Sequence, residues 1–525
     1  MFETKVSSIF LSLIFSVFVF AGVISAQGQS GPIVVYEDHH DTSAPVREFA
    51  KSTPRSESYS ENYIVEFLGR RPWPVIPSSE PDPVVQRVEL PKVATTNLLN
   101  FDGVTDIDGD APPDTNASVG ATQVVETVNT SYQVFNKTTG HSVFGPAEIG
   151  SIWSGFGGDC ANGPFYSDPV VLYDKAAGRW LVTIIGSSDG FATGTECVAV
   201  SATSDATGSY HRYGFSLAPN LGDYPKFGVW PDGCYASYNV FGPFSYLYAE
   251  ACAYDRANML SGGAANAICF QNPNDFSFLP SDLDGAGVAT AGEPNFFVEL
   301  NPNNSSSLSL FKFSVNFSNP SLSTFSGPTV INVAAYNQAC GGGTCIPQPG
   351  TSQRLDSLAD RLMHRLAYRN FSNHEALVVT HSVTGTAAVS NIRWYEIRSP
   401  NATPVVFQQG TFPYNNISLW MASIAMDKVG DIAFGTSGSS NAVHPSIGYT
   451  GRVPSDPLGT MESPAVIKVA NGSQTGGLNR WGDYSSMSID PSDDCTFWYA
   501  QEYIPSNGSF NWNTRLASFK FNACQ

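Results

Sequence analysis

The chain has 525 residues, of which 42% are hydrophobic and 12% aromatic, so it can bury a large core; this excludes general disorder and a small scaffold held together only by disulfides. Its 46 acidic and 27 basic side chains give a net charge of -19, which opposes electrostatic binding to nucleic acid or to an anionic membrane. Glycine, proline, phenylalanine and tyrosine are abundant, and no stretch after residue 30 keeps a helical apolar period. This pattern predicts an all-β protein rich in turns.

The N-terminus has the features of a secretory signal peptide. Residues 1–26 contain Lys5, an apolar run over 9–24, and Ser25 and Ala26 at the expected cleavage site. A membrane anchor is the alternative, but the apolar run is near the short end of what spans a bilayer. We therefore expect a secreted protein that makes no membrane contact after cleavage.

The 9 cysteines of an exported chain are most simply interpreted as structural disulfides. Their positions around loops, an expected hairpin and neighbouring strands suggest four pairs: Cys160–Cys197, Cys252–Cys269, Cys340–Cys345 and Cys495–Cys524. Cys234 is left over. No histidine is close to it in the sequence, so a half-buried structural side chain is favoured over a nucleophile.

The chain divides into an arm and a repetitive body. Residues 27–95 are rich in proline, serine and charge, which predicts an extended arm or linker before a single domain over 96–525. The body repeats one unit: an acidic or aromatic residue, a strand, a turn with Asp and Gly, and a second strand. The copies lie at 119–129, 168–183, 224–238, 279–300, 362–383, 421–434 and 484–499, of which 279–300 is the least regular.

This repetition predicts a β-propeller with four-stranded antiparallel blades. Seven blades are expected, with six as the alternative, whereas a two-sheet sandwich would not explain the regular spacing. The longest interval contains the Cys340–Cys345 loop and is interpreted as an insertion. Residues 95–101 are expected to supply the outer strand of the blade that ends at 516–521, which would remove a free sheet edge. The residues that mark the units are Asp114, Asp168, Asp223, Asp282, Asp360, Trp420 and Asp483.

In a propeller, residues just before each innermost strand converge at one mouth of the central channel. Carboxylates there can hold sugar hydroxyls, bind a cation or act as acid and base; alternatively, they accept backbone hydrogen bonds at strand entries. Arg361, His364 and Arg365 can hold an acidic sugar, or the arginines can form buried ion pairs. The aromatic residues Trp420, Trp481 and Tyr484 can stack on sugars or fill the core. The catalytic candidates are Asp223, Asp360, His364 and Asp483, and the ligand-binding candidates are Asp114, Asp168, Arg361, Arg365, Trp420, Trp481 and Tyr484.

Asp106, Asp108 and Asp110 alternate as the carboxylates of a calcium loop do. An EF-hand requires Gly and Glu where this chain has Ala111 and Ala117, so that motif is excluded. A looser Ca²⁺ site is one hypothesis for this loop, and a solvated acidic loop is the other.

Several segments resemble those of a family of secreted bacterial β-propeller proteins that has no established activity. They are Pro112–Asn116, Trp153–Gly158, Asp168–Trp180, Asp360–Glu375 and Arg480–Ser485. The segment Ser488–Trp498 is also similar to the Asp-box of sialidases, although it lacks the central glycine of that motif, and the Arg-Ile-Pro signature of sialidases is absent. Both resemblances imply a propeller and neither implies catalytic residues.

The sequence thus predicts a secreted, monomeric propeller that binds an extracellular glycan or protein through its channel-mouth face. The alternative is a carbohydrate-active enzyme, a glycoside hydrolase or polysaccharide lyase that acts on an acidic glycan. Two carboxyl groups about 5–10 Å apart in a cleft would favour hydrolysis, whereas carboxylates occupied by backbone amides or arginines would favour binding. A structural surface protein with a blocked mouth is a third interpretation.

Overall fold

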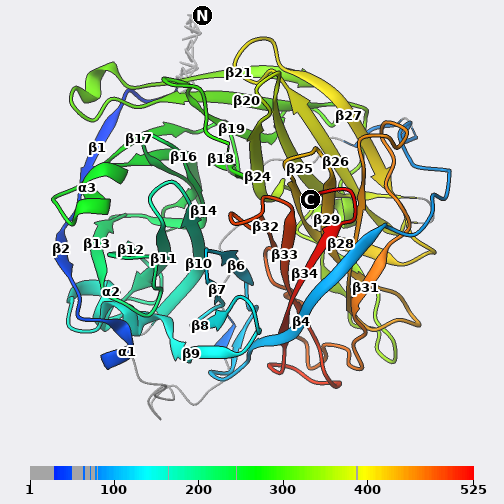
Figure 1. Ribbon diagram of the computed structural model, residues 1–525, viewed down its shortest axis with the longest axis horizontal. Helices are drawn as coiled ribbons and strands as arrows, with labels where there is room; N and C mark the ends of the chain where they lie inside the picture. Colours follow the sequence, from blue (N-terminus) through cyan, green and yellow to red (C-terminus); the bar gives the residue numbers. More distant parts are fainter. Residues whose placement is uncertain are drawn as a thin grey trace, which may run out of the picture.

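The computed structural model describes residues 29–49, 63–64, 71–72, 77–79, 81–163, 165–243, 245–285, 287–385 and 388–525. The predicted signal peptide at 1–26 lies outside the described residues. The described chain is all-β and β-propeller-like, with antiparallel sheets grouped around a common centre (Figure 1). Among its few helices are α1 (Val46–Phe49), α2 (Gly158–Asn162) and α3 (Arg256–Ser261), and no helix in the described ranges is long and apolar enough to cross a membrane.

The strands of the body follow one another in antiparallel groups of four. The first group is β6 (Asn116–Val119), β7 (Gln123–Thr127), β8 (Ser131–Asn136) and β9 (Ser142–Glu148). The second is β10 (Phe165–Asp174), β11 (Arg179–Ser187), β12 (Thr195–Ser201) and β13 (Tyr210–Ser216). The third is β14 (Leu221–Val229), β15 (Cys234–Phe241), β16 (Tyr246–Tyr254) and β17 (Asn266–Asn272).

The next two groups share one sheet, because β18 pairs in parallel with β24. One group is β18 (Leu279–Leu283), β19 (Asn295–Leu300), β20 (Ser307–Ser314) and β21 (Thr324–Asn332). The other is β24 (Met363–Asn370), β25 (Glu375–Thr384), β26 (Ser390–Arg398) and β27 (Val405–Phe412). Between them lies the predicted insertion, with a 3-10 helix (Ala339–Gly342), β22 (Thr344–Ile346) and β23 (Leu355–Asp356).

The chain ends in two further groups. The first is β28 (Ser418–Met426), β29 (Ile432–Ser439), β30 (Ser446–Arg452) and β31 (Ala465–Lys468). The second is β32 (Ser486–Ile489), β33 (Thr496–Tyr503) and β34 (Asn513–Phe521), completed by β4 (Thr95–Thr105). The antiparallel pairing of β4 with β34 places Phe101 opposite Leu516, which confirms the predicted outer strand.

The arm takes part in the sheets, which its composition did not indicate. β1 (Ile33–Tyr36) pairs with β17 and β2 (His39–Thr42) pairs with β13, so each adds a fifth strand at the periphery (Figure 1). β3 (Tyr63–Ile64) pairs in parallel with β5 (Asp110–Ala111), just before the first group. The arm therefore covers sheet edges that would otherwise be open.

The recurring unit of the sequence is the hairpin formed by the first two strands of each group, including the irregular copy at 279–300, where Leu279 pairs with Val298. These first strands also contact one another in turn: β6 with β10, β10 with β14, β14 with β18, β18 with β24, β24 with β28, β28 with β32, and β32 with β6. Residues that precede distant strands are therefore brought toward one centre.

All four predicted disulfides form: Cys160–Cys197, Cys252–Cys269, Cys340–Cys345 and Cys495–Cys524. Cys234 is the free cysteine of the described chain, and it is buried. Burial raises the pKa of its thiol far above the ordinary value, so the reactive thiolate is disfavoured.

The contact between the last two groups depends on aromatic packing. Phe519 of β34 is fully buried and stacks on Tyr449 with 3.7 Å between ring centroids; Phe497 lies 5.4 Å away on the neighbouring strand. We predict that Phe519→Ala lowers the free energy of unfolding by about 3–5 kcal/mol, because it opens a cavity where these groups meet.

The measurement is a denaturant titration followed by circular dichroism. The matched control is Val466→Ala in β31, whose side chain is 63% exposed and which should leave the midpoint unchanged. Equal midpoints for the two variants would contradict this account of the packing.

Candidate functional site

Four of the first strands have, within the strand or just before it, a backbone conformation that is unusual for residues with a side chain. The φ angle is positive at Asp114 (47°), Asp168 (56°), Tyr224 (57°) and Met421 (51°). At the last three of these positions the pairing with the second strand is also interrupted. Such an interruption redirects side chains, and it recurs at or next to the marker residues Asp168, Asp223 and Trp420.

Three of the predicted carboxylates meet at the centre. Asp114, Asp168 and Asp483 each offer an oxygen within 4.8 Å of the others, and all three side chains are buried. The backbone N–H of Asp483 donates to Asp114 at 2.7 Å, and Arg480 donates to Asp483 at 2.6 Å. These residues form what we call the axial cluster.

Lys226 lies beside the axial cluster in an aromatic box. Its ammonium is 3.4 Å from the centre of the Tyr224 ring and 4.0 Å from that of Tyr484. Burial lowers the pKa of Lys226 to about 8, although Asp168 and the other axial carboxylates favour its charged form. The attraction to the carboxylates therefore does not fully offset the loss of water.

The same burial keeps protons on the carboxyl groups. Burial, and then the negative charges of Asp483 and Asp168, raise the pKa of Asp114 well above its usual range. Burial and the same two neighbours raise the pKa of Asp223 to about 8. Asp114 and Asp223 are thus carboxyl groups whose protonated form is favoured by their surroundings.

The two arginines of 361–365 form buried ion pairs, as the second interpretation of the sequence had it. Arg361 donates to Asp360 at 2.8 Å, and Arg365 contacts Asp282 at 3.0 Å and Asp284 at 2.7 Å. His364, between them, hydrogen-bonds to Asn116 at 3.2 Å. Burial, and then Lys226 and Arg365, lower the pKa of His364 well below its usual value, so it is neutral at pH 7.

The tryptophans predicted near the mouth are core residues. Trp420 and Trp481 are fully buried, with their rings 5.4 Å apart, and Tyr484 belongs to the same cluster and donates its hydroxyl to the carbonyl of Pro169. Of the seven marker residues, the most exposed are Asp223 and Asp282, at 7% each. The predicted site residues therefore converge, but as a buried polar network rather than as an open surface.

The acidic loop at 106–110 is held together by hydroxyl groups. Ser131 and Thr130 donate to Asp108 at 2.8 and 2.9 Å, Thr130 also approaches Asp110, and the N–H of Gly109 donates to Asp106. Burial raises the pKa of Asp106 to about 7. The Ca²⁺ site at Asp106, Asp108 and Asp110 stays a prediction.

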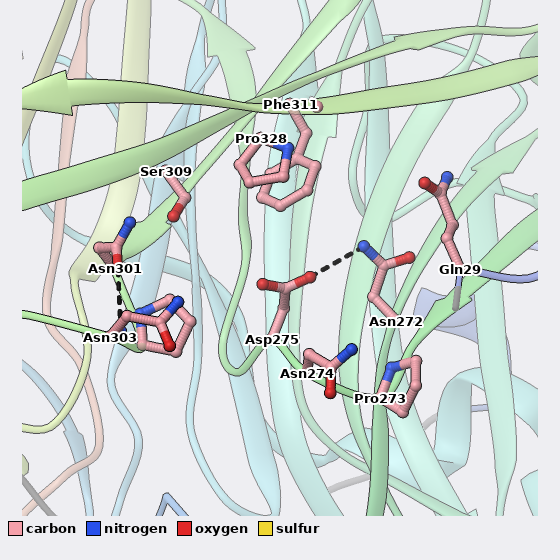
Figure 2. Close-up of a pocket in the computed structure, with 12 residues that line it drawn as sticks. Gln29, Asn272, Pro273, Asn274, Asp275, Asn301, Asn303, Ser309, Phe311 and Pro328 are labelled. Carbon is pink, nitrogen blue, oxygen red and sulfur yellow. Dashed lines mark hydrogen bonds between the residues drawn. The ribbon is translucent and has the colours of Figure 1, made fainter. Parts of the chain in front are cut away.

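An open pocket lies at the same end of the molecule as the strand entries, where the chain enters β18 and where β19 turns into β20 (Figure 2). Its volume is about 770 Å³. Asn272, Asp275, Asn301, Ser309 and Phe311 are buried, and the remaining lining residues form the partly or fully exposed rim. The lining residues are Gln29, Asn272, Pro273, Asn274, Asp275, Asn301, Pro302, Asn303, Ser309, Phe311, Gly327 and Pro328.

Two polar atoms without partners are buried beneath the lining of this pocket. Asn272 donates its amide to Asp275 at 2.9 Å, the bond drawn in Figure 2, and this fixes the orientation of the amide. Its oxygen, and the hydroxyl of Ser309, are buried and have no hydrogen-bond partner among the described residues. Unpartnered buried polar groups are costly unless a ligand or water satisfies them.

The sequence analysis missed this pocket, although the chain carries a signal for it. The tripeptide Asn-Pro-Asn occurs at 272–274 and again at 301–303, and the two copies face the same opening. Proline fixes the backbone of each loop, so the flanking amides are presented in a rigid frame.

The burial of Asp223, beside the axial cluster, has a consequence for stability. A carboxyl whose pKa is raised by folding binds more protons in the folded than in the unfolded state, so its contribution to stability is lost as pH rises from about 4 through the folded pKa of about 8. Asp223→Asn removes this ionisation. We therefore predict that the free energy of unfolding of the variant, relative to that of the natural protein, increases by roughly 1–3 kcal/mol from pH 5 to pH 9.

Denaturant midpoints at both pH values measure this effect. Asp38→Asn is the control because that carboxylate is exposed and lies on the arm. Parallel pH profiles for Asp223→Asn and the natural protein would show that the buried carboxyl carries no such cost.

No protein-family model matches the chain, and no curated protein matches it. Among solved structures, the chain is similar to a subtype N10 neuraminidase-like protein of A/little yellow-shouldered bat/Guatemala/060/2010, with 10% identity, coverage of 71% of this chain and 98% of that one, and a TM-score of 0.34. It is also similar to a protein of unknown function from Dyadobacter fermentans DSM 18053, with 10% identity, coverage of 68% and 95%, and a TM-score of 0.27. Similarity at this level carries no argument about function.

Proposed function

We propose that the protein is a secreted, monomeric seven-bladed β-propeller that binds an extracellular glycan in the pocket of Figure 2. The seven first strands that contact one another in turn, and the closing pair of β4 and β34, support this architecture. The four disulfides are typical of an oxidising compartment and support secretion.

The polar floor of the pocket is the observation that carries the glycan assignment. Sugars present many hydroxyl groups to a binding site, and this pocket offers several amides and one carboxylate around a volume of about 770 Å³. A docking site for a folded protein would instead be expected to have an apolar, aromatic centre.

Binding fits the geometry better than hydrolysis does. The axial carboxyls are buried, and Asp483, Asp360 and Asp282 are bound by arginines. The lining of the pocket contains one carboxylate, Asp275, whereas glycoside hydrolysis uses two that face the scissile bond. The enzyme alternative, which assigned Asp223, Asp360, His364 and Asp483 to catalysis, therefore lacks an open pair of carboxyls at these positions.

A bulky side chain introduced at the rim of the pocket tests the proposal. Asn303 is exposed at the opening, so Asn303→Trp should fill the mouth of the pocket without disturbing the core. We predict that the natural protein is retained on at least one member of an immobilised polysaccharide panel and that Asn303→Trp lowers this retention by about tenfold or more.

The control is Asn373→Trp, an equally exposed position in the turn between β24 and β25, at the opposite end of the sheet. This variant should be retained like the natural protein. Loss of retention in both variants, or in neither, would contradict the proposed site, and the appearance of new reducing ends in the panel would favour the enzyme alternative.

A further inference from the structure

The axial cluster contains a carboxylate oxygen that no hydrogen bond satisfies. The side chain of Asp168 is 4% exposed, and its Oδ2 accepts the hydroxyl of Ser167 at 2.8 Å. Its Oδ1 is buried and has no hydrogen-bond partner among the residues that the structure describes, and the same is true of Oδ2 of the neighbouring Asp223. Buried oxygens of this kind are costly unless water or an ion satisfies them.

The three axial carboxylates have the spacing of ligands around one ion. Asp114, Asp168 and Asp483 each offer an oxygen within 4.8 Å of the others. Oxygens that bind Ca²⁺ at about 2.3–2.6 Å lie about 3–5 Å from one another, so these three fit around a single ion. Such an ion requires no accessible surface in the folded protein, because it can be enclosed as the strand entries come together.

The charges at the centre do not balance. If ionised, the three axial carboxyls and that of Asp223 carry at least two negative charges more than Lys226 and Arg480 offset. Protons on Asp114 and Asp223 relieve this excess, and a divalent cation relieves it equally well.

Lys226 does not take the place of such a cation. Its ammonium donates to the carbonyl of Pro225 at 2.8 Å and lies over the rings of Tyr224 and Tyr484. It is therefore beside the carboxylates, where it adds positive charge but leaves Oδ1 of Asp168 without a partner.

From this geometry we propose that the axial cluster binds one Ca²⁺ ion through carboxylate oxygens of Asp114, Asp168 and Asp483. The cluster offers only hard oxygen ligands, which favour Ca²⁺ or Mg²⁺ over zinc, and Mg²⁺ gives up its water reluctantly in a buried site. Asp114 precedes β6, Asp168 lies in β10 and Asp483 precedes β32, so the ion joins the first, second and last groups of strands. The proposal does not depend on glycan binding in the pocket of Figure 2.

The test is isothermal titration calorimetry of the full chain, dialysed against EDTA, with CaCl₂ and with MgCl₂. We expect Ca²⁺ to bind at least about tenfold more tightly than Mg²⁺. Asp168→Asn keeps the size of the side chain and should lower the affinity for Ca²⁺ by about tenfold or more. The control is Asp38→Asn, which changes the net charge equally at an exposed position of the arm and should leave the affinity unchanged.

Lys226→Met is a second variant, and its expected effect has the opposite sign. It removes the positive charge beside the cluster and keeps an apolar side chain between the two rings, so the affinity for Ca²⁺ should rise by about tenfold or more. A loss of affinity through poor folding cannot imitate this gain, and far-UV circular dichroism checks the fold of both variants.

Three results would overturn the proposal: no binding of Ca²⁺, an unchanged affinity in Asp168→Asn, or an unchanged or lower affinity in Lys226→Met. Loss of binding in Asp108→Asn but not in Asp168→Asn would also overturn it, because the ion would then belong to the acidic loop at 106–110. None of these results bears on the retention of the protein by polysaccharides.

Discussion

The structure depends on the mutual contact of the first strands of the groups. Each of these strands packs against the first strand of the next group, and the entries of distant segments therefore meet at one centre. Polar residues at these positions are buried away from water. Each ionisable group there is therefore either paired with an opposite charge or neutral. Arg361, Arg365 and Arg480 supply partners, and the carboxyls of Asp114 and Asp223 keep protons instead.

This constraint separates two roles that the sequence alone could not distinguish. An aspartate at a strand entry can serve either a ligand or the fold, and the residue pattern is the same in both cases. In the structure Asp114 accepts the N–H of Asp483 and the amide of Asn129, which joins the entries of the first and last groups. The axial cluster thus ties together segments that lie far apart in the sequence, whereas the ligand atoms of the proposed site come from two neighbouring groups.

Much of the fold could be predicted from the sequence, because alternating apolar residues and Asp-Gly turns are local signals. These signals located the hairpins, the outer strand at 95–101 and the four disulfides. The strands of the arm were missed because β1 and β2 complete sheet edges supplied by segments about 170 to 230 residues away, and composition carries no information on such pairing. The burial of Trp420 and Asp360 could also not be predicted from the sequence, because it depends on how the groups of strands pack against one another.

The pocket illustrates a different limit of sequence reasoning. Its two Asn-Pro-Asn loops are visible as a repeat, but only the fold brings Asn272, Asn301 and Ser309 to the same opening. The central claim is that this opening, and not the axial cluster, contacts the ligand. The most direct test is hydrogen-deuterium exchange with and without a saturating oligosaccharide. We predict protection confined to residues 272–275 and 301–303; protection of the first-strand entries around residues 114, 168 and 483, with none at the two loops, would contradict the account.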